Sequence, residues 1–149
     1  MENNFSFSEF NQLSTLQLYD YLQLRSEVFV VEQNCVYQDL DNLDKIAFHV
    51  LLHKGDNLIA CARIIPAGIT YDEISIGRVI VAGHERQKNI GMQLMNYCID
   101  RIKEHFGPQT IVLSAQAHLQ EFYQKLGFEA LGESYLEDGI PHIKMRRNK

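Results

Sequence analysis

A long apolar run that leads into a basic turn and then into a periodic apolar segment constrains this chain more than any other feature. Residues 73–82 are largely apolar. They predict a strand covered on both faces, because a half-exposed strand alternates apolar and polar positions. In residues 89–106, apolar side chains recur every fourth position, which is typical of an amphipathic helix. A buried strand that leads into such a helix favours an α/β (α+β) fold.

The turn between these elements, Arg86-Gln87-Lys88-Asn89-Ile90-Gly91, predicts an anion site at a helix start. The first N–H groups of a helix lack intrahelical partners, and the helix dipole adds partial positive charge there. Arg86 and Lys88 add full charges. Asn89 adopts positive φ more readily than most residues, and Gly91 lacks a Cβ where a ligand would approach. An ordinary solvated turn is the alternative that spacing alone leaves open, and neither a Walker loop nor a Gly-x-Gly-x-x-Gly loop matches.

The remaining elements alternate in type along the chain. Residues 54–57 predict a hairpin turn between two apolar runs, and Ser14 is placed to cap a first helix. That helix is expected to carry Leu18, Leu22 and Phe29 on roughly one face. The predicted strands are residues 5–10, 46–53, 58–65, 73–82, 110–114, 128–136 and 142–145, and the predicted helices are 14–31, 89–106 and 118–126. No linker-like stretch divides them, so residues 1–149 are expected to form one domain.

Composition excludes several classes of protein. A net charge of −5 argues against broad nucleic-acid binding, which needs a basic face to neutralise phosphates. No stretch approaches the roughly 18 apolar residues of a membrane span, and the first residues lack the pattern of an export signal, so a cytoplasmic location without membrane attachment is expected. The cysteines are three in number and widely spaced, which predicts reduced, mostly buried thiols.

Two motifs in order along the chain resemble the GNAT superfamily of acyl-CoA-dependent N-acyltransferases. The family motif Arg/Gln-x-x-Gly-x-Gly/Ala after an apolar strand matches Arg86 and Gly91, with Asn89 in place of the first glycine. The segment Phe122-Tyr123-Gln124-Lys125-Leu126-Gly127-Phe128 resembles the family's Phe/Leu-Tyr-x-x-x-Gly-Phe. Residues 24–49 and 137–142 look like the ElaA-type branch, so the resemblance covers nearly the whole chain.

The resemblance implies a mixed, strongly twisted central sheet of about six or seven strands flanked by helices. It implies that acetyl-CoA is the co-substrate, with loop amides on the pyrophosphate and residues 80–82 beside the pantetheine arm. Gln116 stands where the family often carries an asparagine that contacts coenzyme A. The expected cofactor-binding residues are Ile80, Val81, Ala82, Arg86, Gln87, Lys88, Asn89, Ile90, Gly91, Met92 and Gln116.

Amide formation needs a base for the amine, a donor for the oxyanion and an acid for the departing sulfur. The resemblance assigns the acid to Tyr123 and the oxyanion donor to a backbone amide near Val81. For the base, Glu32 is the first choice, because a carboxylate beside an apolar run can take a proton. His142, which follows a turn near the expected acceptor pocket, is the alternative base. Simpler interpretations remain for both residues: His142 as a solvated loop histidine and Tyr123 as a core tyrosine.

Other charged residues suggest less specific roles. Asp39, Asp41 and Asp44 lack the glycine and distal glutamate of a calcium loop, so no metal is expected. They are interpreted as an acidic surface loop that attracts a cationic amine. Arg63 and Arg78 lie on strands that are otherwise apolar, where a buried cation needs a partner, and either could line the acceptor site.

The predicted function is an N-acetyltransferase that moves an acetyl group from acetyl-CoA to a primary amine by direct attack. A non-catalytic acyl-CoA-binding or regulatory module is the alternative, and an enzyme for another phosphate ligand, such as ATP or NAD, is a third. The amine acceptor, a small molecule or a protein, is not identified by the sequence. Family members are often dimers, so a homodimer is one expectation.

Overall fold

A computed structural model describes residues 3–86 and 88–149 and forms one seven-stranded sheet with helices on both faces. The strands are β1 (Asn3–Glu9), β2 (Phe48–Lys54), β3 (Asn57–Ile65), β4 (Ile74–Val81), β5 (Ile111–Gln116), β6 (Glu129–Glu137) and β7 (Ile140–Arg147). The α-helices are α1 (Thr15–Arg25), α2 (Ile90–Phe106) and α3 (Gln120–Gln124). A π-helix, η2 (Ser26–Glu32), continues α1, and short 3-10 turns are η1 (Phe10–Gln12), η3 (Leu43–Ile46), η4 (Gly83–Glu85) and η5 (Ala117–Leu119).

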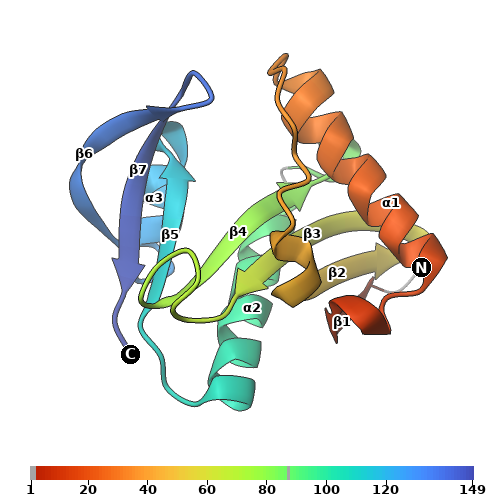
Figure 1. The fold of residues 1–149 in the computed structure, drawn as a ribbon, viewed down its shortest axis with the longest axis horizontal. Helices are drawn as coiled ribbons and strands as arrows, with labels where there is room; N and C mark the ends of the chain where they lie inside the picture. The colour runs from red at the N-terminus through yellow and green to blue at the C-terminus, as the bar shows by residue number, and fades with distance from the viewer. Residues whose placement is uncertain (1–2, 87) are drawn as a thin grey trace.

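The sheet is mixed, with strand order β1-β2-β3-β4-β5-β7-β6, which confirms the predicted fold class. Neighbouring strands are antiparallel except for the central pair, β4 and β5, which run parallel. That pair is joined only at Ile74↔Ile111 and Ser75↔Val112. Beyond these residues the two strands diverge, and the sheet opens toward the end of β4 (Figure 1). The two central strands are therefore splayed apart at this end of the sheet.

Two clusters of buried side chains hold helices against opposite faces of the sheet. Alternate residues of one strand face opposite sides. Ala60 and Ala62 accordingly belong to the larger cluster under α2, whereas Cys61 belongs to a smaller one under α1. Figure 1 shows α1 on the near side of the sheet and α2 on the far side. Apolar side chains on both faces explain why β3 and β4 read as continuous apolar runs.

The start of α1 is set by local hydrogen bonds, whereas its buried face differs from the prediction. Ser14 Oγ accepts from the Gln17 N–H at 3.1 Å, and Gln17 Oε1 accepts from the Ser14 N–H at 2.9 Å. Leu18, Leu22 and Phe29, which were expected on roughly one face, are only partly buried, and Phe29 packs against the cluster under α1. The buried side chains on this stretch are Tyr21, Leu24, Arg25 and Val28. A pattern based on apolar residues alone passes over a buried arginine and tyrosine.

The turns and helix α2 follow the sequence closely. In α2, Ile90, Leu94, Cys98 and Ile102 are buried, as their fourfold spacing predicts.

Cys61 and Cys98 are buried free thiols and Cys35 is a partly exposed one, in agreement with the prediction of reduced, mostly buried cysteines. Among the helices of the described residues, none is long and apolar enough to pass through a membrane.

Candidate functional site

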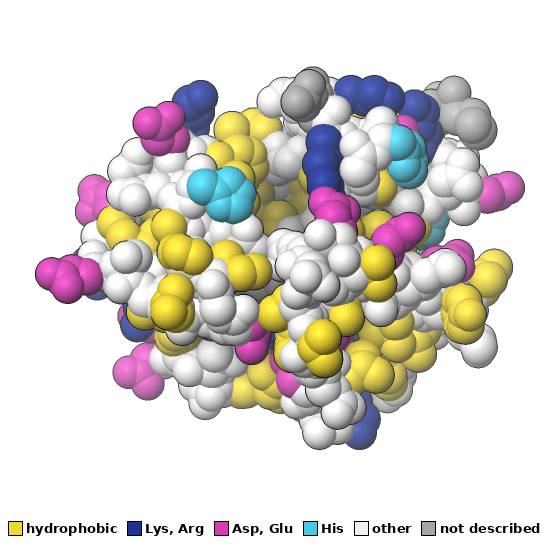
Figure 2. Space-filling model, turned by 90° about the horizontal axis from the view of Figure 1, so that it is seen from above, with side chains coloured by type: hydrophobic (Ala, Val, Ile, Leu, Met, Phe, Trp, Pro, Cys, Tyr) yellow, Lys and Arg dark blue, Asp and Glu magenta, His cyan; other side chains and the backbone are white. Residues whose placement is uncertain are grey.

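A cleft of about 1250 Å3 opens where β4 and β5 separate. Figure 2, which looks at the molecule from above the view of Figure 1, shows a hollow with apolar side chains at its floor and charged side chains around it. The cleft is lined by most of the predicted site residues, namely Glu32, Ile80, Val81, Arg86, Asn89, Ile90, Gly91, Met92, Gln116, Tyr123 and His142. Residues far apart in the sequence thus meet at one opening.

Of the predicted cofactor-binding residues, two do not line the cleft and one is not described by the structure. Ala82 and Lys88 are not among the lining residues. The Ala82 N–H donates to the Ile59 carbonyl at 2.8 Å, so this amide completes the pairing of β3 with the end of β4. Gln87 lies outside the described residues.

The start of α2 presents backbone donors at the mouth of the cleft. Asn89 has φ of 62°, the left-handed value that its residue type tolerates, and makes no side-chain cap bond. The Gln93 N–H donates to the Asn89 carbonyl at 3.3 Å, so the N–H groups of Ile90, Gly91 and Met92 precede the first intrahelical bond. Together with the positive end of the helix dipole, these groups can hold a phosphate.

Gly91 leaves a small space beside the start of α2 that no other side chain of the protein fills tightly. A Cβ at this position would lie 3.4 Å from Phe122 Cζ, which is ordinary van der Waals contact. The fold therefore accommodates a larger residue here. The absence of a side chain is explained better by the close approach of a ligand to the α2 backbone.

Arg86 joins the end of β4 to η2 across the cleft. Its Nε donates to the Val81 carbonyl at 3.0 Å, and its two terminal nitrogens donate to the two oxygens of Glu32. The side chains of Arg86 and Glu32 are 41% and 43% exposed, so their ion pair lies at the solvent-facing rim. Both oxygens of Glu32 are therefore engaged by a cation rather than directed at the floor of the cleft.

Glu85 pairs with Lys88, the second cation of the turn. Lys88 Nζ lies 3.0 Å from Glu85 Oε2, and Lys54 Nζ lies 3.4 Å from Oε1. Hydrogen bonding by Lys88 and the nearby charge of Lys54 hold the pKa of Glu85 below its ordinary value. Lys88 is half-exposed, so it contributes positive potential near the α2 start without facing the cleft.

Tyr123 lies on α3, between the core and the cleft. Its side chain packs edge-on against Phe122 and Phe128 and is 6% exposed. Burial raises the pKa of Tyr123 to about 12, so the phenol keeps its proton across the neutral range. A protonated phenol at the cleft can donate to an atom that gains negative charge.

His142 lies near the start of β7, on the sheet face opposite the α2 core. Its neighbour Ile143 belongs to that core, and successive strand residues face opposite sides. His142 Nδ1 lies 2.7 Å from the Ile140 carbonyl, which can only accept, so Nδ1 carries the proton. The second ring nitrogen, Nε2, lies 3.4 Å from Glu137 Oε2. The hydrogen bond to Ile140 thus fixes the orientation of the imidazole, with Nε2 on the side of Glu137.

The interpretation of residues 39–44 as an acidic surface loop is wrong. Asp39 and Asp44 are buried, and with Asp41 they pair with three arginines. The ion pairs are Arg25–Asp39 (2.9 Å), Arg25–Asp44 (2.7 Å), Arg63–Asp41 (2.8 Å), Arg63–Asp44 (3.1 Å) and Arg78–Asp39 (2.8 Å). The carboxylates therefore compensate buried guanidinium groups instead of attracting a cationic ligand.

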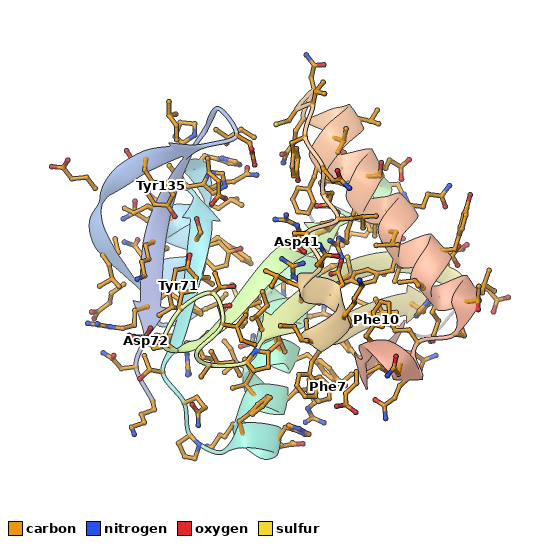
Figure 3. All side chains as sticks on the ribbon, viewed as in Figure 1. Phe7, Phe10, Asp41, Tyr71, Asp72 and Tyr135 are labelled. Atoms are coloured by element: carbon orange, nitrogen blue, oxygen red, sulfur yellow. The ribbon has the colours of Figure 1, made fainter. Side chains whose placement is uncertain are left out.

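We name these six residues (Arg25, Arg63, Arg78, Asp39, Asp41 and Asp44) the Arg–Asp cluster. Burial by itself would raise the pKa of Asp44, but hydrogen bonds and charge from Arg25 and Arg63 outweigh it and lower the pKa. Figure 3 labels Asp41 on one side of the opening between β4 and β5 and Tyr135 on the other. Arg63, Arg78 and Asp41 of this cluster line the cleft.

Polar residues that the sequence did not indicate lie beside His142, on neighbouring strands of the same half of the sheet. Ser114 Oγ and the Tyr135 hydroxyl form a hydrogen bond, and the Tyr135 ring stacks on His142 with centroids 6.3 Å apart. Cys35 Sγ donates to the Asp138 carbonyl at 3.3 Å, which joins the loop after η2 to the turn between β6 and β7. The turn itself is visible as Glu137-Asp138-Gly139, but nothing in the sequence indicates what lies opposite it.

A mixed sheet that opens between two parallel central strands, beside an uncapped helix start, is the architecture of acyl-CoA N-acyltransferases. A crystal structure of an acyl-CoA N-acyltransferase from Pseudomonas aeruginosa superposes with a TM-score of 0.93 at 38% identity, covering 98% of this chain and 99% of that chain. The chain belongs to the GNAT acetyltransferase family, since the acetyltransferase (GNAT) domain model matches residues 15–149.

Within this family, the chain is similar to the protein ElaA of Escherichia coli. The two sequences are 48% identical over 139 residues, which is 92% of this chain and 91% of ElaA. The crystal structure of ElaA superposes with a TM-score of 0.93, covering 99% of this chain and all of ElaA (100%). An aminoglycoside 6'-N-acetyltransferase complexed with coenzyme A has the same fold, with a TM-score of 0.72 at 20% identity over 95% of this chain and 96% of that chain.

Proposed function

We propose that the protein is an N-acetyltransferase that transfers the acetyl group of acetyl-CoA to a primary amine by direct attack. The observation that carries this proposal is the joint placement of three features at one cleft. They are the unpartnered N–H groups that start α2, the edge of β4 that is released from β5, and the buried phenol of Tyr123. The thioester supplies the acyl group, and the protein supplies binding and proton transfer.

Each end of the cleft suits one part of the co-substrate. The α2 start suits the pyrophosphate, because backbone donors and the helix dipole favour an anion. The free edge of β4 offers backbone groups to the amide-containing pantetheine arm, as an edge strand offers them to any extended chain. Arg86 holds the Val81 carbonyl at 3.0 Å and so stabilises the end of that strand beside Glu32.

Two side chains assist the reaction in this proposal, one by taking a proton and one by donating a hydrogen bond. The amine must lose a proton as its nitrogen bonds to the acyl carbon, and the sulfur leaves as the C–S bond breaks. His142 Nε2 receives the amine proton, since Nδ1 is already committed to Ile140. The geometry favours His142 over Glu32 as the base, because Arg86 engages both oxygens of Glu32. Tyr123 donates a hydrogen bond to the sulfur, which leaves as a thiolate and then takes its proton from water or from the imidazolium of His142.

The first test measures binding and turnover separately. Coenzyme A at 100 times its dissociation constant should stabilise the protein by about 2.7 kcal/mol in a thermal unfolding assay, whereas ATP or NAD should not. Acetyl-CoA with an amine panel should release thiol at a rate that depends on the amine. Equal stabilisation by ATP would contradict the proposed ligand. Binding of coenzyme A without turnover on any amine would instead support a non-catalytic acyl-CoA-binding module.

A further inference from the structure

Arg78 occupies an unusual position on β4. It has φ of 49°, a left-handed backbone conformation that costs free energy for any residue with a Cβ. The pairing of β3 with β4 shifts register here, since Cys61 opposes Ile80 while Arg63 opposes Gly77. A β-bulge therefore directs the Arg78 side chain toward η2 rather than along the regular strand. Strain of this kind persists where the surrounding structure or a function requires it.

The guanidinium of Arg78 is held in place on one side. Its Nε lies 2.8 Å from Asp39 Oδ1, and its central carbon lies 5.3 Å from the centre of the Phe29 ring. Asp39 also pairs through its other oxygen with Arg25 Nε at 2.9 Å, so this carboxylate is shared between two arginines. An arginine fixed in this way by an acid and an aromatic face is oriented before any ligand arrives.

The other side of the guanidinium faces the cleft. Arg78 Nη2 lies 4.0 Å from Asp41 Oδ2, which is beyond hydrogen-bonding distance, and the side chain is 25% exposed. Arg78 lines both the main cleft and a smaller recess of about 40 Å3 that His142 also lines. Beside it, a Cβ built on Gly77 would meet no atom within 4 Å, so the space at the neighbouring position is open.

Arg78 supplies the positive charge in the smaller recess, which Glu137 and Asp138 also line. The three carboxylates of the Arg–Asp cluster are matched by its three arginines, so the cluster carries no excess of negative charge that would hold a cationic amine. The terminal nitrogens of an arginine form two parallel hydrogen bonds with a planar carboxylate. A phosphate dianion fits less well, since the added charge would lie close to Asp41.

From this geometry we propose that Arg78 binds a carboxylate of the acceptor, so that the acetylated amine belongs to a molecule that also carries a carboxylate group. This inference rests on the proposed acetyltransfer and names the class of its acceptor. A carboxylate on Arg78 and an amine near His142 can belong to one short molecule, because both side chains line the same recess. Arg78 is then a specificity-determining residue.

The first experiment compares acceptors that differ only in this group. Thiol release from acetyl-CoA is measured with each α-amino acid and with its amide, together with polyamines. The acids should have values of kcat/KM at least tenfold higher than their amides. Two further sets of acceptors distinguish where the carboxylate lies in the acceptor. One set is ω-amino acids of increasing length. The other is C-terminally amidated peptides whose only carboxylate is a glutamate side chain. Amides or polyamines that react as well as the acids would overturn the proposal.

The second experiment changes Arg78. In Arg78→Asn the new residue tolerates the left-handed backbone, and in Arg78→Lys the charge remains without the planar fork. Arg78→Asn should lower kcat/KM for the acids by about 10- to 100-fold, mainly through KM, and should leave the amides nearly unchanged. Arg78→Lys should fall between. Arg101→Asn, which removes an ion pair with Glu104 on α2, is the matched control. Equal losses on acids and amides would show a structural role instead.

A third measurement does not depend on turnover. N-acetyl amino acids and their amides are titrated into the protein saturated with coenzyme A, and binding is followed by calorimetry. The protein should bind the acids more tightly than the amides, and this preference should disappear in Arg78→Asn. That result would support the carboxylate site even if no amine were acetylated. In that case only the proposed reaction would fail. Equal binding of acids and amides, or no binding of any acid, would overturn the carboxylate site while leaving acetyltransfer to other amines open to the first experiment.

Discussion

Burial determines what Tyr123 can contribute as a single residue. Because its pKa is raised to about 12, the phenol remains protonated at every pH at which the protein would work. An ordinary thiol has a pKa of about 8.5, so outright transfer of the tyrosine proton to a thiolate is uphill. Tyr123 is therefore better suited to stabilise the departing sulfur through a hydrogen bond than to give up its proton completely.

Replacing Tyr123 by phenylalanine tests this role. Loss of the hydroxyl should lower kcat by about 100-fold, because one preorganised donor to a developing charge is removed, while affinity for coenzyme A stays within about threefold. Steady-state rates and calorimetric binding would measure the two effects. Tyr97→Phe is a matched control, since Tyr97 lies on α2 stacked on Phe5 and is not among the residues that line the cleft. An unchanged kcat in Tyr123→Phe would exclude the hydroxyl from the reaction.

At the scale of elements, the separation of β4 from β5 and the start of α2 together make the binding site. Only Ile74 and Ser75 of β4 pair with β5, so the rest of this edge is not used by the sheet. The following turn ends at Asn89, whose left-handed conformation begins α2 without a side-chain cap. Each element therefore leaves backbone groups unpaired at its end, and both ends lie at the same cleft.

Gly91→Ala should separate helix stability from ligand binding. The change raises helix propensity, so the free energy of unfolding should increase by up to about 1 kcal/mol. The added methyl group would fit against Phe122 but would obstruct a pyrophosphate on the α2 amides. Affinity for coenzyme A should fall by about 10- to 100-fold, because hydrogen bonds to a charged group are weakened.

Urea unfolding and calorimetry with coenzyme A would measure the two effects of Gly91→Ala. Asn96→Ala is the control, because Asn96 is an exposed residue in the interior of the same helix and the change raises propensity without approaching the cleft. Unaltered affinity in Gly91→Ala would mean that the ligand does not approach the helix start closely.

At the scale of the whole molecule, buried polar groups tie the N-terminal segment to the sheet. The Arg–Asp cluster joins α1 and the loop at residues 39–44 to β3 and β4. His49 on β2 extends these contacts: its Nδ1 accepts from the Tyr21 hydroxyl at 2.9 Å, and its Nε2 donates to the Asp44 carbonyl at 2.8 Å. These contacts hold η2, and with it Phe29 and Glu32, as one wall of the cleft.

This arrangement predicts a loss of stability in mild acid. Burial lowers the pKa of His49 below its ordinary value of about 6.5, so the unfolded chain binds a proton that the folded protein does not. The stabilisation is therefore complete above about pH 6.5 and is lost as the pH falls toward the folded-state pKa, by at most about 1.4 kcal/mol per pH unit. Asp41 and Asp44, whose pKa values are also lowered, add a further loss below about pH 4.

Urea unfolding at pH 7.5, 6.5 and 5.5 would measure the contribution of His49. In His49→Gln no group titrates at this position, so the dependence on pH over this range should become flatter, even if the variant is less stable throughout. His53→Gln on the same strand is the control, because His53 is partly exposed and lies outside the buried contacts of His49. The same slope in wild type and His49→Gln would contradict the assignment.

The order and type of elements follow from local physics and could be read from the sequence. Fourfold spacing placed the buried face of α2, and the residue type of Asn89 predicted its positive φ. The buried face of α1 was not predicted, because Arg25 and Tyr21 are buried there by their partners rather than by their hydropathy. Most predicted site residues meet at the cleft, although their roles in binding and catalysis stay predictions.

By itself the sequence determined the strand, turn and helix that build the α2 start, because helix periodicity, capping and turn preferences act between residues close along the chain. Only the tertiary structure decided the partners of the charges. Arg86 meets Glu32 across 54 residues, and Arg78 reaches Asp39 from a bulge in another element. An ion pair depends on separation in space and on burial, and neither is encoded in local spacing. For that reason the acids at residues 39–44, which look in the sequence like a loop that attracts a cation, instead pair with arginines. One of these arginines, Arg78, faces the cleft.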